Sequence, residues 1–163
     1  LVGRYPPQGK PPVISQILLP DNGEQVFSLR PFVASFLAGA EILCHIDAVS
    51  DNFLFVEGRE RPYLIDWEYA GLSDPLIDIA MFAIYADYHE DETEQLIAAY
   101  FPEGFDALLR ARVYTYMAVG GLLWYDWSVY KSSLGVTFGP YEESQFRFAK
   151  EYAVKARKEW EML

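Results

Sequence analysis

The feature that most constrains the fold is a pair of short β-prone runs, residues 53–56 and 62–65, joined by five residues that include Gly58. Runs of this kind predict a β-hairpin. If Phe53 pairs with Ile65, Asn52 lies beside Asp66 at one end of the ladder, with the two Cα atoms about 5 Å apart. The sequence therefore predicts that an amide and a carboxylate share one site, as a bound cation requires.

Four helices are predicted after the hairpin. Asp74 and Pro75 suit a helix start, and residues 76–88 are apolar nearly all round, which is typical of a buried helix. The other predicted helices are residues 91–100, residues 105–133 with a weak point at Gly120-Gly121, and the amphipathic residues 140–162. Upstream, the pattern predicts a helix over residues 26–40, interrupted at Pro31, and a short buried strand over residues 41–45. The predicted fold class is α+β, mostly α-helical.

Composition sets limits on function. A chain of 163 residues that is 52% hydrophobic supports one domain with a real core. Its longest apolar stretch ends at Asp126 and is shorter than the ~20 residues of a membrane span, so no span is expected. The single cysteine, Cys44, favours a reducing compartment, so we expect a cytoplasmic protein. The net charge of −11 disfavours nucleic acid and suits a cationic small molecule, although acidity also serves solubility.

A His-x-Asp-x-x-x-x-Asn pattern runs from His45 through Asp47 to Asn52. This is the spacing of a kinase catalytic loop, in which the Asp accepts the proton of the substrate hydroxyl and the Asn holds a metal ion. The alternative is a polar turn between two strands, because three residues at fixed spacing recur by chance. Asp66 follows the hairpin, where a kinase has its second magnesium ligand. Oxygen ligands such as these suit Mg²⁺, and Asp47 is left to deprotonate an alcohol.

A longer stretch makes the resemblance specific. Cys-His-Ile-Asp-Ala-Val-Ser-Asp-Asn-Phe-Leu-Phe is followed by Leu-Ile-Asp-Trp-Glu-Tyr-Ala-Gly and Asp-Pro-Leu-Ile-Asp-Ile-Ala. Over residues 43–152 the chain resembles the choline kinase branch of the aminoglycoside-phosphotransferase-like, protein-kinase-like superfamily. The resemblance implies a kinase-like C-terminal lobe with a small hairpin at the catalytic loop. It also implies transfer of the ATP γ-phosphate to the hydroxyl of choline, with Mg²⁺ and ATP as cofactors.

The resemblance also implies roles for individual residues. Asp47 is the expected catalytic base, Asn52 and Asp66 the expected magnesium ligands, and Glu68 a support of the same site. His45 is expected to brace the loop. Asp78 stands nearly alone among apolar neighbours, where a carboxylate needs hydrogen bonds, and is expected to hold the loop's backbone.

An aromatic pair marks a candidate binding site. Trp124 and Trp127 are three residues apart on a predicted helix and so share a face. Helical spacing alone favours packing in the core, because aromatic stripes usually pack. The resemblance instead implies walls around the quaternary ammonium of choline, held by cation–π attraction. The candidate walls are Trp124, Trp127, Tyr141, Tyr85 and Tyr88.

Two parts of a complete kinase are not found in the sequence. It contains no G-x-G-x-x-G loop, and none of its five lysines has the β-rich context of a kinase strand lysine. We therefore expect residues 1–40 to be a linker or the remnant of a missing N-terminal lobe, and residues 41–163 to be the lobe that binds substrate. We expect the chain alone to be inactive. The alternatives are a sister kinase for ethanolamine, an aminoglycoside or another amino alcohol, and a non-catalytic fragment that binds quaternary ammonium groups.

Overall fold

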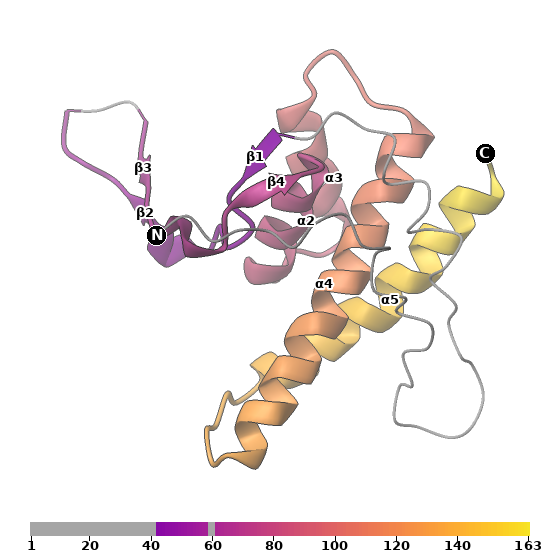
Figure 1. Ribbon diagram of the computed structural model, residues 1–163. Coiled ribbons are helices and arrows are strands. Elements are labelled where there is room, and N and C mark those ends of the chain that lie inside the picture. The colour runs from indigo at the N-terminus through magenta and orange to yellow at the C-terminus, as the bar shows by residue number, and fades with distance from the viewer. Residues whose placement is uncertain (1–41, 59–60) are drawn as a thin grey trace, which may run out of the picture. The chain divides into compact units, whose positions relative to one another are not determined.

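The computed structural model describes residues 42–58 and 61–163 (Figure 1). The predicted helix over residues 26–40 and the predicted linker lie outside the described residues. Single 3₁₀ turns cover Ser50–Asn52 and Trp67–Tyr69. The strands are β1 (Ile42–Cys44), β2 (Phe53–Leu54), β3 (Tyr63–Leu64) and β4 (Gly71–Ser73). The helices are α2 (Leu76–Tyr85), α3 (Glu90–Tyr100), α4 (Ala107–Ser133) and α5 (Tyr141–Glu161).

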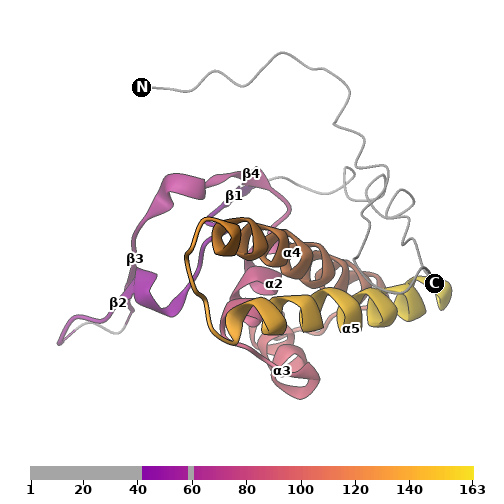
Figure 2. The same cartoon turned by 90° about the horizontal axis from the view of Figure 1, so that it is seen from below.

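The helices form the core. In both views α4 and α5 run side by side, and α2 packs against α4 (Figures 1 and 2). The apolar face of α2 is buried through Ile79, Ala80 and Ile84, against Met117 of α4. Phe148 of α5 is also fully buried in this cluster. No helix in the described part of the chain is long and apolar enough to cross a membrane.

The glycine pair in α4 is a packing site. The helix runs unbroken from Ala107 to Ser133, through the glycine pair at which the sequence predicts a weak point. A Cβ atom on Gly121 would lie 2.8 Å from the carbonyl oxygen of Gln145 and from the backbone nitrogen of Ala149. The glycine thus lets α4 and α5 approach more closely than a side chain would permit.

The helix α2 ends at Tyr85, three residues before the predicted end at Tyr88. Asp87 has a left-handed backbone with φ 55°, which cannot continue a right-handed helix. Its carboxylate accepts a hydrogen bond from the Ser144 hydroxyl at 2.6 Å and pairs with Arg147 at 2.5 Å, both on α5. The turn after α2 is therefore fixed to α5.

The strands form two antiparallel pairs. β1 pairs with β4, a strand that the sequence pattern did not predict, with Leu43 opposite Leu72. In the hairpin Phe53 pairs with Leu64, so the predicted pairing of Phe53 with Ile65 is wrong by one residue. The backbone N–H of Ile65 donates to the carbonyl oxygen of Asn52 at 3.0 Å. Asp66 is the next residue and has φ 62°, so the ladder ends before it.

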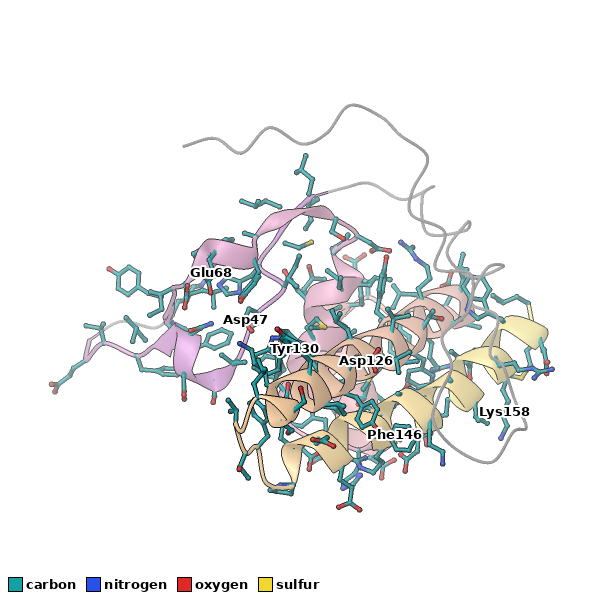
Figure 3. The ribbon with its side chains drawn as sticks, turned by 60° about the horizontal axis from the view of Figure 1, so that its bottom comes forward. Asp47, Glu68, Asp126, Tyr130, Phe146 and Lys158 are labelled. Carbon is teal, nitrogen blue, oxygen red and sulfur yellow. The ribbon has the colours of Figure 1, made fainter. Side chains whose placement is uncertain are left out.

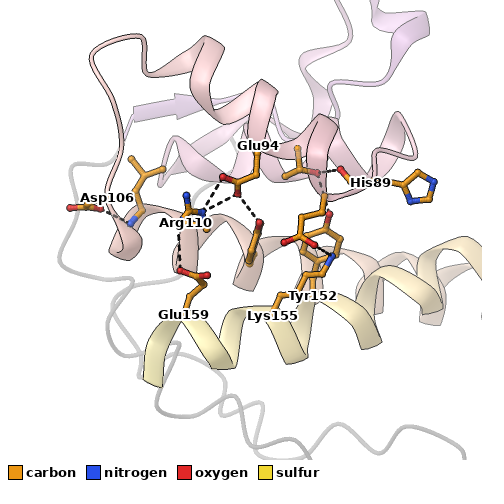
Figure 4. Close-up of polar contacts among 11 residues, drawn as sticks. His89, Glu94, Asp106, Arg110, Tyr152, Lys155 and Glu159 are labelled. Carbon is orange, nitrogen blue, oxygen red and sulfur yellow. Dashed lines mark hydrogen bonds and ion pairs between the residues drawn. The ribbon is translucent and has the colours of Figure 1, made fainter. Parts of the chain in front are cut away.

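A cluster of paired charges joins the three longest helices (Figure 4). Glu94 of α3 accepts hydrogen bonds from Arg110 at 3.0 and 3.1 Å and from the hydroxyl of Tyr114 at 2.6 Å, both on α4. Arg110 also lies 3.7 Å from a carboxylate oxygen of Glu159 on α5. We call these four residues the Glu94 cluster. Burial and the neighbouring Glu94 raise the pKa of the Tyr114 phenol.

Candidate active site

The loop after β1 is held by a carboxylate from α2. Asp78 accepts hydrogen bonds from the backbone N–H of His45 at 3.0 Å and of Ile46 at 2.7 Å, one on each oxygen. Ile46 has φ 72°, a left-handed conformation that costs a β-branched residue about 1–3 kcal/mol. The two bonds to Asp78 hold this strained turn, and Asp47 follows it directly. Asp78 is the residue that the sequence analysis expects to hold the loop's backbone.

His45 connects the loop to the hairpin. Its side chain is 2% exposed, and Nε2 lies 2.7 Å from the carbonyl oxygen of Ile65. Because a carbonyl oxygen only accepts, this contact requires the proton on Nε2. The imidazole also meets the edge of the Trp67 ring, with centroids 4.8 Å apart. His45 thus links the residue before Asp66 to the turn before Asp47.

Asn52 orients Asp47. Its Nδ2 donates to the Asp47 carbonyl oxygen at 2.9 Å and to Asp47 Oδ2 at 3.3 Å. Asn52 is 8% exposed, whereas Asp47 is half-buried. The amide nitrogen is therefore used inside the loop, and the amide oxygen Oδ1 remains available as a ligand.

The phenol of Tyr69, which the sequence analysis did not single out, lies near three of the predicted carboxylates. The pKa of Tyr69 is raised, chiefly by the negative charge of Glu68 and also by those of Asp47 and Asp66. Figure 3 shows Asp47 and Glu68 at the end of the structure that carries the hairpin. Among the described residues, no Lys or Arg forms an ion pair with any of these carboxylates. The structure thus gathers uncompensated negative charge around Asp47.

The donor set fits a magnesium ion bound partly by other groups. The described residues contain no cluster of three or more His, Cys, Asp or Glu side chains that could hold a metal. The predicted ligands, Asn52 Oδ1 and the exposed carboxylate of Asp66, supply two hard oxygens. Mg²⁺ usually takes one or two carboxylates and fills its other positions with water and phosphate oxygens. Because of the corrected register, Asp66 follows the residue opposite Asn52 instead of facing Asn52 itself.

Two phenols face Asp47 from the helical side. Burial raises the pKa of Tyr141 to about 12, and the charge of Asp47 adds to this shift. The pKa of Tyr85 is raised by the same two causes in the same order. Tyr85 is the last residue of α2 and Tyr141 the first of α5. Residues far apart in the sequence therefore meet at Asp47.

A continuous series of aromatic rings joins these two phenols. The Tyr85 and Trp124 centroids are 5.9 Å apart, and Trp124 meets Trp127 edge to face at 5.6 Å. Trp127 lies 5.1 Å from Phe138, which lies 6.2 Å from Tyr141. We call these five residues the aromatic arc. Phe138 was not among the predicted walls, and both ends of the arc are residues whose phenols sense the charge of Asp47.

The members of the arc differ in burial. Trp124 packs against the hydrophobic core, as helical spacing alone indicates, but Trp127 is 39% exposed. The hydroxyl of Tyr85 and the indole N–H of Trp124 are buried and make no hydrogen bond within 3.5 Å among the described residues, although Asp47 and Trp124 lie close enough to the Tyr85 hydroxyl to affect its pKa. Tyr88 packs instead on Phe82, with centroids 5.9 Å apart, and no described ring contact joins it to the arc.

A cavity lies beside Tyr85. Its volume is about 380 Å³, and it is bounded by Ala48 after the loop, Phe53 and Phe55 of the hairpin segment, and Phe82 and Tyr85 of α2. Tyr85 is thus a member of both the aromatic arc and the lining of this cavity.

Comparison with known proteins gives consistent relatives. Residues 20–140 match the phosphotransferase enzyme family. Protein LicA of Haemophilus influenzae is 31% identical over 104 residues, which cover 60% of this chain and 38% of that protein.

Solved structures agree with this match. Choline kinase LicA from Streptococcus pneumoniae has a TM-score of 0.60 and 29% identity, covering 78% of this chain and 44% of that one. A LicA structure in complex with AMP gives 0.62 and 28% over the same shares. A choline/ethanolamine kinase family protein from Mesorhizobium loti gives 0.56 and 28%, covering 81% of this chain and 44% of that one.

These matches confirm the predicted fold, that of a kinase-like C-terminal lobe. The chain spans less than half the length of the relatives that it matches.

Proposed function

Because the chain belongs to the phosphotransferase enzyme family, we propose that it is the catalytic and substrate-binding lobe of a choline kinase, which transfers the γ-phosphate of ATP to the hydroxyl of choline. The aromatic arc that begins and ends beside Asp47 carries the proposal. A base and a set of aromatic faces in one place suit a substrate that has a hydroxyl near a quaternary ammonium.

Asp47 is the proposed general base. Phosphoryl transfer needs little covalent help, so the protein's task is to position the reacting groups and to stabilise charge. The bonds from Asn52 to Asp47 and from the loop backbone to Asp78 position the carboxylate. As the alcohol oxygen bonds to the γ-phosphorus, the bond from that phosphorus to the bridging oxygen breaks and ADP leaves, and the proton of the alcohol passes to a carboxylate oxygen of Asp47.

Asn52 Oδ1 and Asp66 are the proposed magnesium ligands, and Glu68 adds negative charge to the same site. The bound ion would neutralise charge on the phosphates of ATP. The LicA structure with AMP supports a nucleotide as the second ligand, because the similarity to LicA covers 78% of this chain. The proposed partner is an N-terminal kinase lobe that supplies the Gly-rich loop and the strand lysine.

Choline is favoured over ethanolamine by the chemistry of the arc. A quaternary ammonium has no N–H to donate and is bound by electron-rich faces. A primary ammonium donates hydrogen bonds and depends more on carboxylates. Ethanolamine is the second candidate, because the Mesorhizobium loti relative is a choline/ethanolamine kinase family protein.

Binding and turnover separate the candidates. We would titrate the chain with choline, ethanolamine and the neutral isostere 3,3-dimethyl-1-butanol by calorimetry. Choline should bind most tightly, and equal affinity for choline and the neutral alcohol would exclude a cation site. We would also measure phosphocholine formation from ATP in a protein that includes a nucleotide-binding lobe. Choline binding without transfer in that protein would favour a non-catalytic binding fragment.

A further inference from the structure

A lysine of the chain lies over the most exposed tryptophan of the aromatic arc. The Lys131 Nζ atom is 5.5 Å from the centroid of the Trp127 ring. Lys131 follows Trp127 by four residues on α4, so its side chain lies one turn further along the same helix face. Among residues 42–58 and 61–163, no carboxylate forms an ion pair with Lys131, whereas Lys155 pairs with Glu90 at 3.0 Å. The Trp127 ring is thus the contact that defines the position of this ammonium.

The contact places the chain's own cation where a cationic ligand is expected. Trp127 is flanked by Trp124 and Phe138 and is 39% exposed, so the Lys131 ammonium lies over a ring that a ligand can also reach. A ligand ammonium that approaches this ring must displace the Lys131 ammonium or lie near it. The first outcome removes a cation–π contact, and the second brings two positive charges together.

We propose that Lys131 is a specificity-determining residue that competes with the ligand's ammonium for the Trp127 ring. This inference rests on the proposed function, because it requires a cation site at the aromatic arc. The competition weakens binding of every monocation at the arc, and it weakens binding of a neutral ligand of the same shape less, because the Lys131 charge does not repel a neutral ligand. Lys131 therefore lowers the affinity of the site for cationic ligands, so a higher ligand concentration is needed to fill it.

The expected effect follows from the strength of an exposed cation–π contact. Removal of the charge at Lys131 should tighten binding of choline and of tetramethylammonium about two- to fivefold. Lys131→Gln removes the charge, keeps a polar end group and shortens the side chain by one atom. Lys131→Arg keeps the charge and stacks better on aromatic rings, so affinity should stay the same or fall.

The α5 helix offers a matched control. The Lys150 Nζ atom lies 5.2 Å from the centroid of the Phe146 ring, a contact of the same kind. Phe146 packs on Tyr125, which is not part of the aromatic arc. Lys150→Gln therefore changes net charge by the same amount without freeing a ring of the arc.

The test is a titration of the four proteins with tetramethylammonium, choline and 3,3-dimethyl-1-butanol, followed by tryptophan fluorescence and calorimetry, with circular dichroism as a check on folding. The proposal expects tighter cation binding for Lys131→Gln alone, with a larger gain for the two cations than for the neutral alcohol. Unchanged or weaker cation binding in Lys131→Gln would overturn it, as would equal tightening in Lys150→Gln. If the wild-type protein binds no quaternary ammonium, both this inference and the proposed function fail. If the wild type binds and Lys131→Gln matches it, only this inference fails.

Discussion

The two ends of α4 differ in how the charges around them are paired. Near its start, Arg110 pairs with Glu94 and Glu159, and Tyr114 donates to Glu94. About 25 Å further along the helix, Trp127 lies in the arc beside Asp47, and no Lys or Arg among the described residues pairs with that carboxylate. Paired charges stabilise a fold, whereas unpaired ones keep their capacity to bind a ligand. The contrast indicates that the first end stabilises the packing of the helices and that the second end serves ligand binding and catalysis.

The largest expected effect is on turnover at the second end. In a protein that includes the nucleotide-binding lobe, Asp47→Ala should lower kcat by about 10²- to 10⁴-fold, because general-base catalysis has this magnitude. The melting temperature should change little, since Asp47 is only half-buried. Asp51→Ala is the matched control, because Asp51 is an exposed carboxylate of the same loop. A decrease of less than tenfold in kcat, or a similar decrease in the control, would contradict the assignment of Asp47 as the general base.

A second comparison sets Asp78, which holds the loop after β1, against the Glu94 cluster. Asp78→Ala leaves the backbone N–H groups of His45 and Ile46 without their acceptor, so unfolding free energy should fall by about 2–3 kcal/mol and kcat should fall with it. Glu94→Gln should cost about 1–2 kcal/mol and leave kcat unchanged. Urea denaturation and steady-state kinetics measure both quantities. Loss of activity in Glu94→Gln beyond the loss of folded protein would break the proposed division between the two ends.

Trp127→Leu should weaken choline binding by about 0.5–2 kcal/mol, the range of a cation–π contact. The loss should be smaller for ethanolamine, and stability should change less than for a core tryptophan because Trp127 is 39% exposed. Calorimetry with both ligands and a thermal melt provide the measurements. Equal losses for the two ligands together with a large drop in stability would assign Trp127 to packing.

The smallest expected effect concerns pH. The pKa of Tyr141 is raised from 10.0 to about 12, so the folded state retains a proton that the unfolded state has lost between these values. The stability from this group is present below pH 10 and is lost as pH rises towards 12. Tyr141→Phe should therefore lose less stability than wild type over this interval. Urea denaturation at pH 9, 10 and 11 measures the difference, and parallel curves for the two proteins would contradict the assignment.

The helices were the most predictable part of the fold. Residues 91–100 and 140–162 were predicted within one residue at each end, because apolar periodicity and caps are local signals. The pairing of β4 was not predicted, since Gly71 and Ser73 carry little strand propensity and the pairing depends on β1. The register of the hairpin differs from the prediction by one residue, because register depends on the length and type of the turn, which the two β-prone runs do not specify.

The candidate site was predictable where roles are fixed by spacing. His45, Asp47 and Asn52 share one loop, and the spacing alone grouped them. The contribution of Tyr69 and Phe138 depends on where separate segments meet, for which a single sequence carries no periodic signal. The prediction at Gly121 rested on the low helix propensity of glycine. In the structure, a Cβ atom at this position would lie 2.8 Å from the backbone of α5, and this close approach explains the glycine.

The most direct test is a crystal structure of the chain with choline, because the account requires one small molecule to reach both Asp47 and the aromatic arc. It predicts the trimethylammonium group within about 6 Å of the Trp124 or Trp127 ring centroid. It also predicts the hydroxyl oxygen about 2.6–3.2 Å from a carboxylate oxygen of Asp47, or joined to it through one water. Choline bound away from the arc, or with its hydroxyl directed away from Asp47, would contradict the account.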